Sequence, residues 1–442
     1  MKRQRIGHLS GAGFYLREVL HAIGSFLPHR GLALRSRDRR VRWTDRLLVM
    51  MAVLMAWDGG GVLGDAFEAC WTAVIGMYPT RRRPGHTYEG FIKALVKHSA
   101  RLLGLVQPAL RQAVRAVAGK CWQVEGWTVM SVDGSRFECP RTKANEAAFG
   151  CAGKDKTTPQ QFITTLLHVG TGLIWDWRRG GGKEAERTHL RAMLGGLPTA
   201  AMLVADAGFT GYELLQELLA GGHSFIIRVG SNVRLLKKLG YALRERDGLV
   251  YLWPRARRAH PPLMLRLVTV HDGRRAMYLL TNVLAEARLS DAQVVEMYRR
   301  RWGIEVFYRS LKRTLEKCKL RSTSPGKAQV ELDWAVAGMW VLGLMTVQRL
   351  LRRRLSPTDM SVAQALRVLR RVLAGRGHRR AARNLRALAS AVKDMYRRGG
   401  PKSTRLWPRK KTEQPPGPPQ IRLATRKERL QIQGLKRKQA AA

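Results

Sequence analysis

The sequence predicts an α/β fold, in which a sheet core is interrupted by a mostly β insertion and flanked by helical N-terminal and C-terminal regions. Apolar residues recur at helical spacing as far as residue 120 and again after residue 288. Short apolar runs bounded by turn residues, typical of strands, occupy most of the interval between them. With 442 residues, 45% of them hydrophobic, the chain is long enough for roughly two or three domains and a sizeable core.

Residues 1–120 are predicted to form a helical N-terminal region. Its expected helices are Tyr15–Leu27, Trp43–Trp57, Asp65–Met77, Tyr88–Leu103 and Pro108–Lys120, separated by glycine- or proline-rich breaks. Basic clusters at 35–42 and 81–83 fall at helix ends or in loops. They are either ordinary solvated loop residues or phosphate contacts, and the composition leaves both interpretations open.

Residues 121–230 are predicted to form the first part of the sheet core. The expected elements are strands at Thr128–Ser135, Gln161–Val169 and Leu173–Arg178, a helix at Glu184–Leu194, a strand at Ala201–Ala205, a helix at Tyr212–Leu219 and a strand at Ser224–Val229. Three antiparallel strands followed by a helix, a strand, a helix and a strand match the ribonuclease-H-like order. In that order the acids that end the first and fourth of these strands, Asp133 and Asp206, lie at the ends of neighbouring central strands.

The remainder of the chain divides by its apolar pattern and its composition. Alternating residues predict a β-rich insertion over 231–287, and residues 288–350 should return to the core with one basic helix and one long apolar packing helix. Residues 351–398 are predicted to be a basic helical region that includes helices at Met360–Leu373 and Arg379–Tyr396. The Pro-rich basic tail, 399–442, has few large apolar residues and is expected to be disordered when free.

The charge of the chain indicates a polyanionic partner. Lysine and arginine number 80 against 32 acids, for a formal charge of +48. Nucleic acid is the first candidate, and its binding would weaken steeply with salt. A GC-rich coding sequence that favours arginine codons is the alternative contribution to this excess. Five cysteines without a CxxC pair indicate a reducing compartment. The main apolar runs, 47–57 and 335–347, are shorter than the roughly 20 residues of a membrane span. We therefore expect a cytoplasmic protein without a membrane partner.

The segment from Ser290 to Lys312 combines one acid with several cations. Ser290 and Gln293 form a capping box that predicts a helix start. At about 100° per residue, the side chains of Tyr298, Arg301, Glu305 and Lys312 would share one stripe of that helix. Such a face suits a site where a metal ion held by Glu305 meets a phosphate held by the other three.

Three carboxylates stand out by context. Asp133 and Asp206 each end a predicted strand, and Glu305 lies in the basic helix. Taken singly, a strand-end Asp before Gly is more often a turn residue, and a helical Glu among arginines is more often a surface ion pair. Gathered together they would repel one another unless divalent ions neutralised them. Oxygen ligands without a His or Cys cluster favour two Mg²⁺ or Mn²⁺ ions over zinc.

The spacing Tyr-x2-Arg-x3-Glu-x6-Lys at 298–312 resembles the Tyr-Arg-Glu-Lys signature of DDE transposases of bacterial insertion sequences, in the IS-four family. The text around all three acids, over about 121–350, is similar to that family. The similar blocks are VDGSRFECPRTKANEAAFG at 132–150, LVADAGF at 203–209 with YELL at 212–215 and FIIRV at 225–229, and Leu320-Arg321-Ser322 with Pro325, Glu331 and Leu332 after the basic helix. One departure is Ala207, which stands where members often carry an arginine after the second Asp.

The resemblance implies a role for each of these residues. Asp133, Asp206 and Glu305 would be the catalytic residues and the ligands of two Mg²⁺ or Mn²⁺ ions. Tyr298, Arg301 and Lys312 would bind DNA phosphates, and Ala207 would remove one such contact. Trp302 would either stack on an unpaired base or pack in the core.

The resemblance also implies a cut-and-paste transposase. It would bind terminal inverted repeats through the 1–120 region, cleave the element ends, join them to target DNA, and act as a homodimer in the synaptic complex. Two alternatives remain at this stage. One is an inactive or domesticated inverted-repeat DNA-binding protein or repressor, and the other is a ribonuclease-H-like nuclease.

Overall fold

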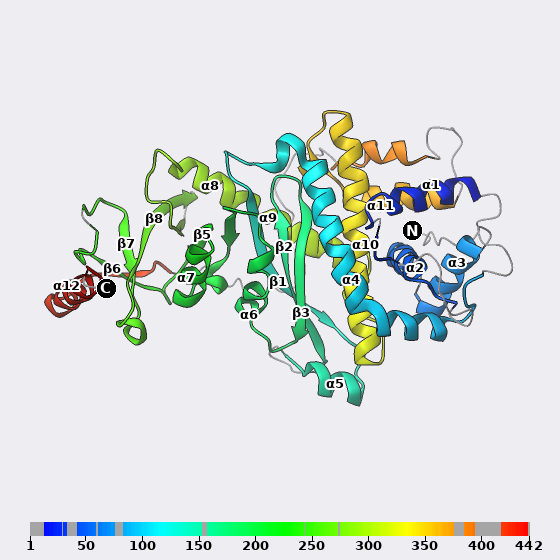
Figure 1. The fold of residues 1–442 in the computed structure, drawn as a ribbon, viewed down its shortest axis with the longest axis horizontal. Coiled ribbons are helices and arrows are strands. Elements are labelled where there is room, and N and C mark those ends of the chain that lie inside the picture. Colours follow the sequence, from blue (N-terminus) through cyan, green and yellow to red (C-terminus); the bar gives the residue numbers. More distant parts are fainter. Residues whose placement is uncertain are drawn as a thin grey trace, which may run out of the picture. The chain divides into compact units, whose positions relative to one another are not determined.

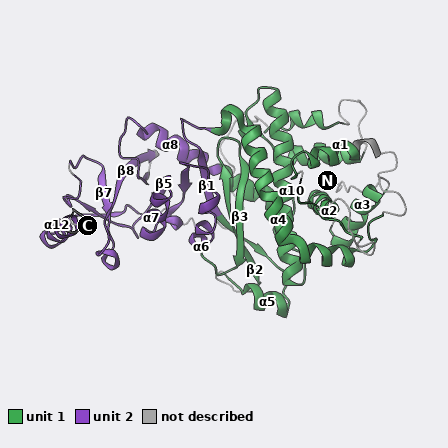
Figure 2. Cartoon of the chain, in the orientation of Figure 1, with its two compact units in different colours: residues 1–122, 134–185, 303–394 green, residues 123–133, 186–302, 395–442 purple. Residues whose placement is uncertain are grey.

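The computed structural model describes residues 13–28, 30–32, 42–58, 61–75, 83–152, 157–242, 244–272, 275–374, 384–393 and 417–440. The chain divides into two compact units, green and purple in Figure 2. Unit 1 comprises residues 1–122, 134–185 and 303–394, and unit 2 comprises residues 123–133, 186–302 and 395–442. Each unit is therefore assembled from three separate segments of the chain.

Unit 1 is a helical layer packed beside a small sheet (Figure 1). Its helices are α1 (Gly13–Gly24), α2 (Asp45–Trp57), α3 (Leu63–Ile75), α4 (Tyr88–Ala118), α5 (Lys143–Phe149), α10 (Pro325–Arg352) and α11 (Val362–Leu373), with α9 described below. Its strands are β2 (Gln160–His168) and β3 (Leu173–Gly181), which form an antiparallel hairpin, and the second half of β1 (Val129–Glu138) beside β2. The predicted breaks agree except at Pro108, which lies inside α4, so two expected helices are one.

Helix α10 is the centre of unit 1 and contacts α2, α4, α11 and β3. By length and composition it could cross a membrane, but 94% of its most apolar stretch is buried inside the fold, as expected of a core helix. The packing against α2 is close, because a Cβ at Gly338 would lie 2.7 Å from the Cβ of Ala56. Trp57 Nε1 donates to the Gly338 carbonyl oxygen at 2.8 Å and fixes the crossing point.

Unit 2 is built on a mixed sheet with helices packed against it. Its strand order is β10-β6-β7-β8-β9-β5-β4-β1. The strands are β4 (Met202–Ala205), β5 (Ser224–Val229), β6 (Arg234–Lys237), β7 (Leu249–Leu252), β8 (Leu263–Asp272), β9 (Arg275–Thr281), β10 (Gln420–Leu423) and the first half of β1, and the helices are α6 (Glu186–Arg191), α7 (Tyr212–Ala220), α8 (Asp291–Arg300) and α12 (Arg426–Ala440). Strands β1, β4 and β5 are parallel, whereas β9 joins β5 antiparallel. The predicted α/β class, with its β-rich insertion and helical terminal regions, is confirmed.

The C-terminal part of the chain departs from the sequence prediction. Residues 417–440 are ordered: β10 pairs in parallel with β6, and Ala424 and Ile432 are buried in an apolar cluster with Leu236 and Trp253. The expectation of disorder is wrong for this part of the tail, while 399–416 lie outside the described residues. The expected helix at Arg379–Tyr396 is described only at 384–393, where residues 385–390 form a short 3₁₀ helix.

A buried ion pair anchors α10 to the loop that precedes it. Glu331 accepts hydrogen bonds from Lys317 Nζ at 3.1 Å, from the backbone N–H groups of Arg321 and Ser322, and from the Ser322 hydroxyl. Burial acts to raise the pKa of Glu331, but the Lys317 charge and these hydrogen bonds outweigh it, so the pKa is lowered. The side chains of Lys317 and Glu331 are only 8% and 5% exposed.

We predict that Glu331→Ala destabilises the protein by about 3–5 kcal/mol, because it leaves the Lys317 ammonium buried without its partner. Since the folded-state pKa of Glu331 is lowered, this stabilisation is complete at neutral pH and is lost as pH falls through that pKa. Chemical denaturation measures the change. The matched control is Glu89→Ala, which breaks a pair with Lys327 at a side chain 66% exposed and should cost about 0–1 kcal/mol. Equal losses for the two variants would contradict the assignment.

Candidate active site

Two of the predicted catalytic acids lie side by side in unit 2. Strands β1 and β4 are parallel neighbours, with Val129 opposite Met202 and Ser131 opposite Val204. If this register is continued by two residues, Asp133 comes level with Asp206, the residue directly after β4. Neighbouring strands are about 4.8 Å apart and side chains alternate between faces, so the two carboxylates share one face of the sheet. The predicted placement on neighbouring central strands therefore holds for this pair, although Asp133 lies within β1 and not at its end.

Local backbone geometry fixes the orientation of Asp206. It caps the 3₁₀ turn Ala207–Phe209, and its Oδ1 accepts a hydrogen bond from the Gly208 N–H at 2.9 Å. A Cβ at Gly208 would lie 3.1 Å from that oxygen and 3.2 Å from Oε2 of Glu186. Glycine thus allows two carboxylates to flank this turn. Nothing in the strand and helix pattern of the sequence had singled out Glu186, because α6 brings it here from another part of the fold.

A cation follows the acids in the same register. Because Ala205 stands opposite Ile227 on β5, the next residue pair is Asp206 and Arg228. Continuing the register of β1, β4 and β5 therefore gives the order Asp133, Asp206, Arg228, with Asp206 directly after β4. Arg228 lies in the FIIRV block at 225–229 that is similar to the family, and the sequence alone predicts no role for it. The strand register is the signal that identifies it.

Helix α8 adds Tyr298 and Arg301 to this group. The capping box at Ser290 is present, so the predicted helix start is correct. Arg301 Nη1 lies 3.8 Å from Asp133 Oδ2, and the guanidinium lies 5.6 Å from the centre of the Tyr298 ring. Burial raises the pKa of the Tyr298 hydroxyl; Arg301 and Arg228 act to lower it, and Asp206 adds to the rise. All these groups of unit 2 are thus within electrostatic reach of one another.

The basic helix is not continuous, which corrects the predicted stripe. Helix α8 ends at Arg300, Arg301 is its C-cap, and α9 (Trp302–Arg309) follows before a π-helical turn over 310–314. The Leu315 N–H donates to the Ser310 carbonyl oxygen at 3.0 Å, an i to i+5 bond. A wheel of uniform angle therefore does not extend from Tyr298 to Lys312. Insertions of this kind are common at functional sites.

The other two residues of the predicted stripe belong to unit 1. Glu305 lies in the first turn of α9 and is partly buried. Lys312 lies in the π turn, with Nζ 5.1 Å from the centre of the Phe137 ring. Burial lowers the pKa of Lys312, while the nearby Cys318 and Glu138 act to raise it. The structure thus brings together Asp133, Asp206, Tyr298 and Arg301 in unit 2, and holds Glu305 and Lys312 on the following segment in unit 1.

Trp302 is 55% exposed, so the alternative of a core tryptophan is wrong. Its indole has a surface available for stacking. Two buried titratable residues of unit 1, Asp176 and His168, have structural partners. Asp176 is buried and paired with Arg111 and Arg178. His168 bonds the Thr171 hydroxyl and the Trp122 carbonyl oxygen, and burial lowers its pKa to about 4.

The chemistry of the donor set fits a hard divalent cation. Asp133 and Asp206 supply carboxylate oxygens, the ligands that Mg²⁺ and Mn²⁺ prefer. Within the described part of the chain, no group of three or more His, Cys, Asp or Glu side chains is arranged to hold a metal ion. The two aspartates are therefore an incomplete ligand set, which further oxygen donors must complete.

Comparison with known proteins identifies the family. A family model described as the transposase DDE domain matches residues 126–342, the segment that contains both aspartates, Glu305 and Lys312. Residues 126–342 therefore resemble a DDE transposase domain. The predicted resemblance is thus confirmed, and the family is a catalytic one that generally uses divalent metal ions.

One curated protein and one solved structure are similar to the chain. The transposase InsG of insertion sequence element IS4 from Escherichia coli (strain K12) is 27% identical to this chain over 294 residues. The match covers 60% of this chain and 65% of that protein, slightly less than two thirds of its length. A cryo-EM structure of a piggyBac transposase synaptic complex with hairpin DNA covers 90% of this chain and 86% of its own, with a TM-score of 0.42 and 13% identity.

We predict that Mg²⁺ raises the melting temperature of this protein through the aspartate pair. Binding only to the folded state adds about 2.7 kcal/mol of stability at a hundredfold excess over Kd. Asp133→Asn removes one carboxylate and should abolish the rise, which differential scanning calorimetry measures. Asp247→Asn, at an exposed aspartate of the same unit, is the control and should keep it. A full rise in Asp133→Asn would place the ion elsewhere.

Proposed function

We propose that this protein is a transposase that binds the terminal inverted repeats of its element, cleaves the element ends and joins them to target DNA. The observation that carries the proposal is the register that sets Asp133 beside Asp206, with Arg301 3.8 Å from Asp133. Paired acids next to cations suit a site where divalent ions and phosphates meet. The formal charge of +48 supports a DNA partner.

Asp133, Asp206 and Glu305 would hold two Mg²⁺ or Mn²⁺ ions. We assign Glu305 as the third ligand because of the order of the acids along the chain and because the sequence around it resembles the family. When bound, the ions would activate a water or a DNA 3′-hydroxyl and stabilise the leaving oxygen. The protein's own part is to hold the scissile phosphate in place, a role for Arg301, Lys312 and the Tyr298 hydroxyl.

Burial strengthens these phosphate contacts. A cation that has already lost part of its hydration, as Lys312 has, loses less when it meets a phosphate. Tyr298 is only 8% exposed, and its raised pKa keeps the hydroxyl protonated, so it remains a hydrogen-bond donor at neutral pH. The exposed indole of Trp302 is proposed to stack on an unpaired base near the cut.

Two copies would act together in the synaptic complex, with one subunit on each end of the element. This follows from the two ends that a cut-and-paste reaction must join. An inactive repeat-binding protein is the second candidate, and the intact set of Asp133, Asp206 and Glu305 weighs against it. A ribonuclease-H-like nuclease would cleave DNA–RNA hybrid in preference to inverted-repeat duplex.

We predict that Glu305→Ala abolishes cleavage of inverted-repeat DNA and leaves repeat binding nearly unchanged. A gel assay of strand cleavage in Mg²⁺, alongside an anisotropy titration, measures both. Glu296→Ala is the matched control, because Glu296 is a half-exposed acid of α8 paired with Arg300. Retained cleavage in Glu305→Ala would reject the assignment of Glu305 as the third metal ligand. Cleavage of hybrid alone by the unaltered protein would favour the nuclease.

We also predict that Lys312→Ala weakens DNA binding without changing metal binding. Loss of one phosphate contact should reduce the slope of log K against log salt by about 0.9. Lys327→Ala, at a lysine paired with Glu89, is the control and should change neither property. Loss of metal binding in Lys312→Ala would mean that Lys312 has been misassigned.

A further inference from the structure

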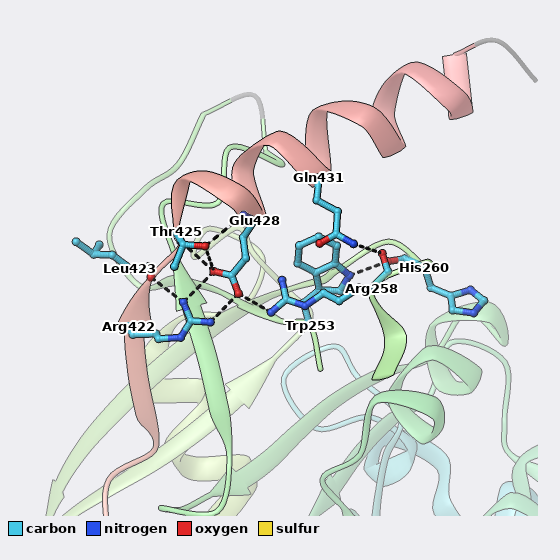
Figure 3. Close-up of polar contacts among 8 residues, drawn as sticks. All are labelled: Trp253, Arg258, His260, Arg422, Leu423, Thr425, Glu428 and Gln431. Atoms are coloured by element: carbon cyan, nitrogen blue, oxygen red, sulfur yellow. Dashed lines mark hydrogen bonds and ion pairs between the residues drawn. The ribbon is translucent and has the colours of Figure 1, made fainter. Parts of the chain in front are cut away.

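The ordered C-terminal segment, 417–440, forms a strap on the insertion of unit 2. Strand β10 runs parallel to β6 from Gln420 opposite Arg234 to Leu423 opposite Lys237. Helix α12 then crosses the insertion, as Figure 3 shows. Polar contacts fix it along its length: Gln431 Nε2 donates to the Arg258 carbonyl oxygen at 3.4 Å, and Lys436 Nζ donates to that of Gly240 at 2.9 Å.

Glu428 is the centre of this contact (Figure 3). Its carboxylate accepts from Arg422 Nη1 and Nη2 at 2.8 and 2.6 Å, and from Arg258 Nη2 at 2.6 Å. Thr425 adds its backbone N–H at 2.9 Å and its hydroxyl at 3.2 Å. The Arg422 hydrogen bonds are the largest cause of a strongly lowered pKa for Glu428, so the carboxylate is ionised throughout the physiological range. One acid of the strap thus orients one arginine of the strap and one of the insertion.

These two arginines line a cavity of about 390 Å³ within unit 2. Arg234 and Arg255 line it as well, together with Asn232 and Trp253, and no acidic residue is among its lining residues. Arg234, Arg255 and Asn232 are exposed, so the cavity is accessible from solvent. Four guanidinium groups around one opening make a site for an anion.

The positive charge at this cavity is only partly compensated. Glu428 offsets Arg422 and Arg258 together, whereas the side-chain partner of Arg234 among the described residues is the neutral Gln420 amide. Arg255 has no ion-pair partner among the described residues. Arg258 also keeps a buried Nη1 without a hydrogen-bond partner in the described part of the chain. An oxyanion in the cavity would neutralise the excess charge.

We propose that this arginine cavity binds a backbone phosphate of DNA together with its flanking sugar. The volume exceeds that of a bare phosphate, and the apolar wall of Trp253, Leu236 and Leu252 suits a sugar face. The proposal rests on the proposed function, because it supplies a second DNA contact for the same protein. It also gives the C-terminal strap a role, since Arg422 completes the wall and Glu428 positions it.

The test is the salt dependence of inverted-repeat DNA binding by the full chain, measured by anisotropy. Arg255→Ala should lower the slope of log K against log salt by about 0.9 and weaken binding several-fold at moderate salt. Arg234→Ala should act alike. Arg246→Ala removes an exposed arginine of the same insertion that does not line the cavity and is the matched control. Slopes for Arg255→Ala and Arg234→Ala equal to that of Arg246→Ala would overturn the proposal.

Further arms separate the other outcomes. Arg422→Gln should reduce the slope like Arg255→Ala while the circular dichroism spectrum stays unchanged; an unchanged slope would remove the strap from the site. Replacing chloride with inorganic phosphate at constant ionic strength should stabilise the unaltered protein no more than it stabilises the Arg255→Ala variant. If phosphate stabilised the unaltered protein but not Arg255→Ala, and the two proteins bound DNA equally, the cavity would be reassigned to a small phosphate ligand. Failure of the unaltered protein to bind DNA at all would instead reject the proposed function.

Discussion

The parallel register between β1 and β4 is the constraint on which the candidate site depends. It sets Asp133 opposite Asp206 at the spacing of neighbouring strands, where two ionised carboxylates repel unless something compensates them. The fold supplies part of the compensation itself. Arg301 approaches Asp133 from α8, and Arg228 continues the row on β5. A pair of acids held together in this way is suited to divalent cations and to the phosphates that accompany them.

Much of this was predictable from sequence because it depends on local patterns. Short apolar runs that end in Asp predicted β1 and β4, and the Ser290–Gln293 capping box predicted the start of α8. The family resemblance then ranked three acids among the chain's 32. These patterns could not predict the register, that is, which residues of neighbouring strands stand opposite one another. Arg228 and Glu186 join the group only because strand pairing and a glycine turn bring them there, and no spacing along the chain records either.

The remaining differences arise where tertiary contacts override local preference. Pro108 was expected to begin a helix, but α4 continues through it. A uniform helical wheel placed Lys312 with Tyr298, whereas the helix is interrupted at Arg301 and again by the π turn at 310–314. Few large apolar residues in the tail predicted disorder. Residues 417–440 are nevertheless ordered, because the edge of β6 offers backbone hydrogen bonds and Glu428 finds two arginines.

The central claim is that Asp133 and Asp206 bind the same metal centre. Iron-directed cleavage of the polypeptide tests this claim most directly. Fe²⁺ in place of Mg²⁺, with ascorbate and peroxide, generates hydroxyl radicals that cut the polypeptide next to the bound ion. Mass spectrometry of the fragments should show cuts beside Asp133 and beside Asp206 together, and both should disappear in Asp206→Asn. Cutting beside only one of the two aspartates, or at neither, would contradict the account.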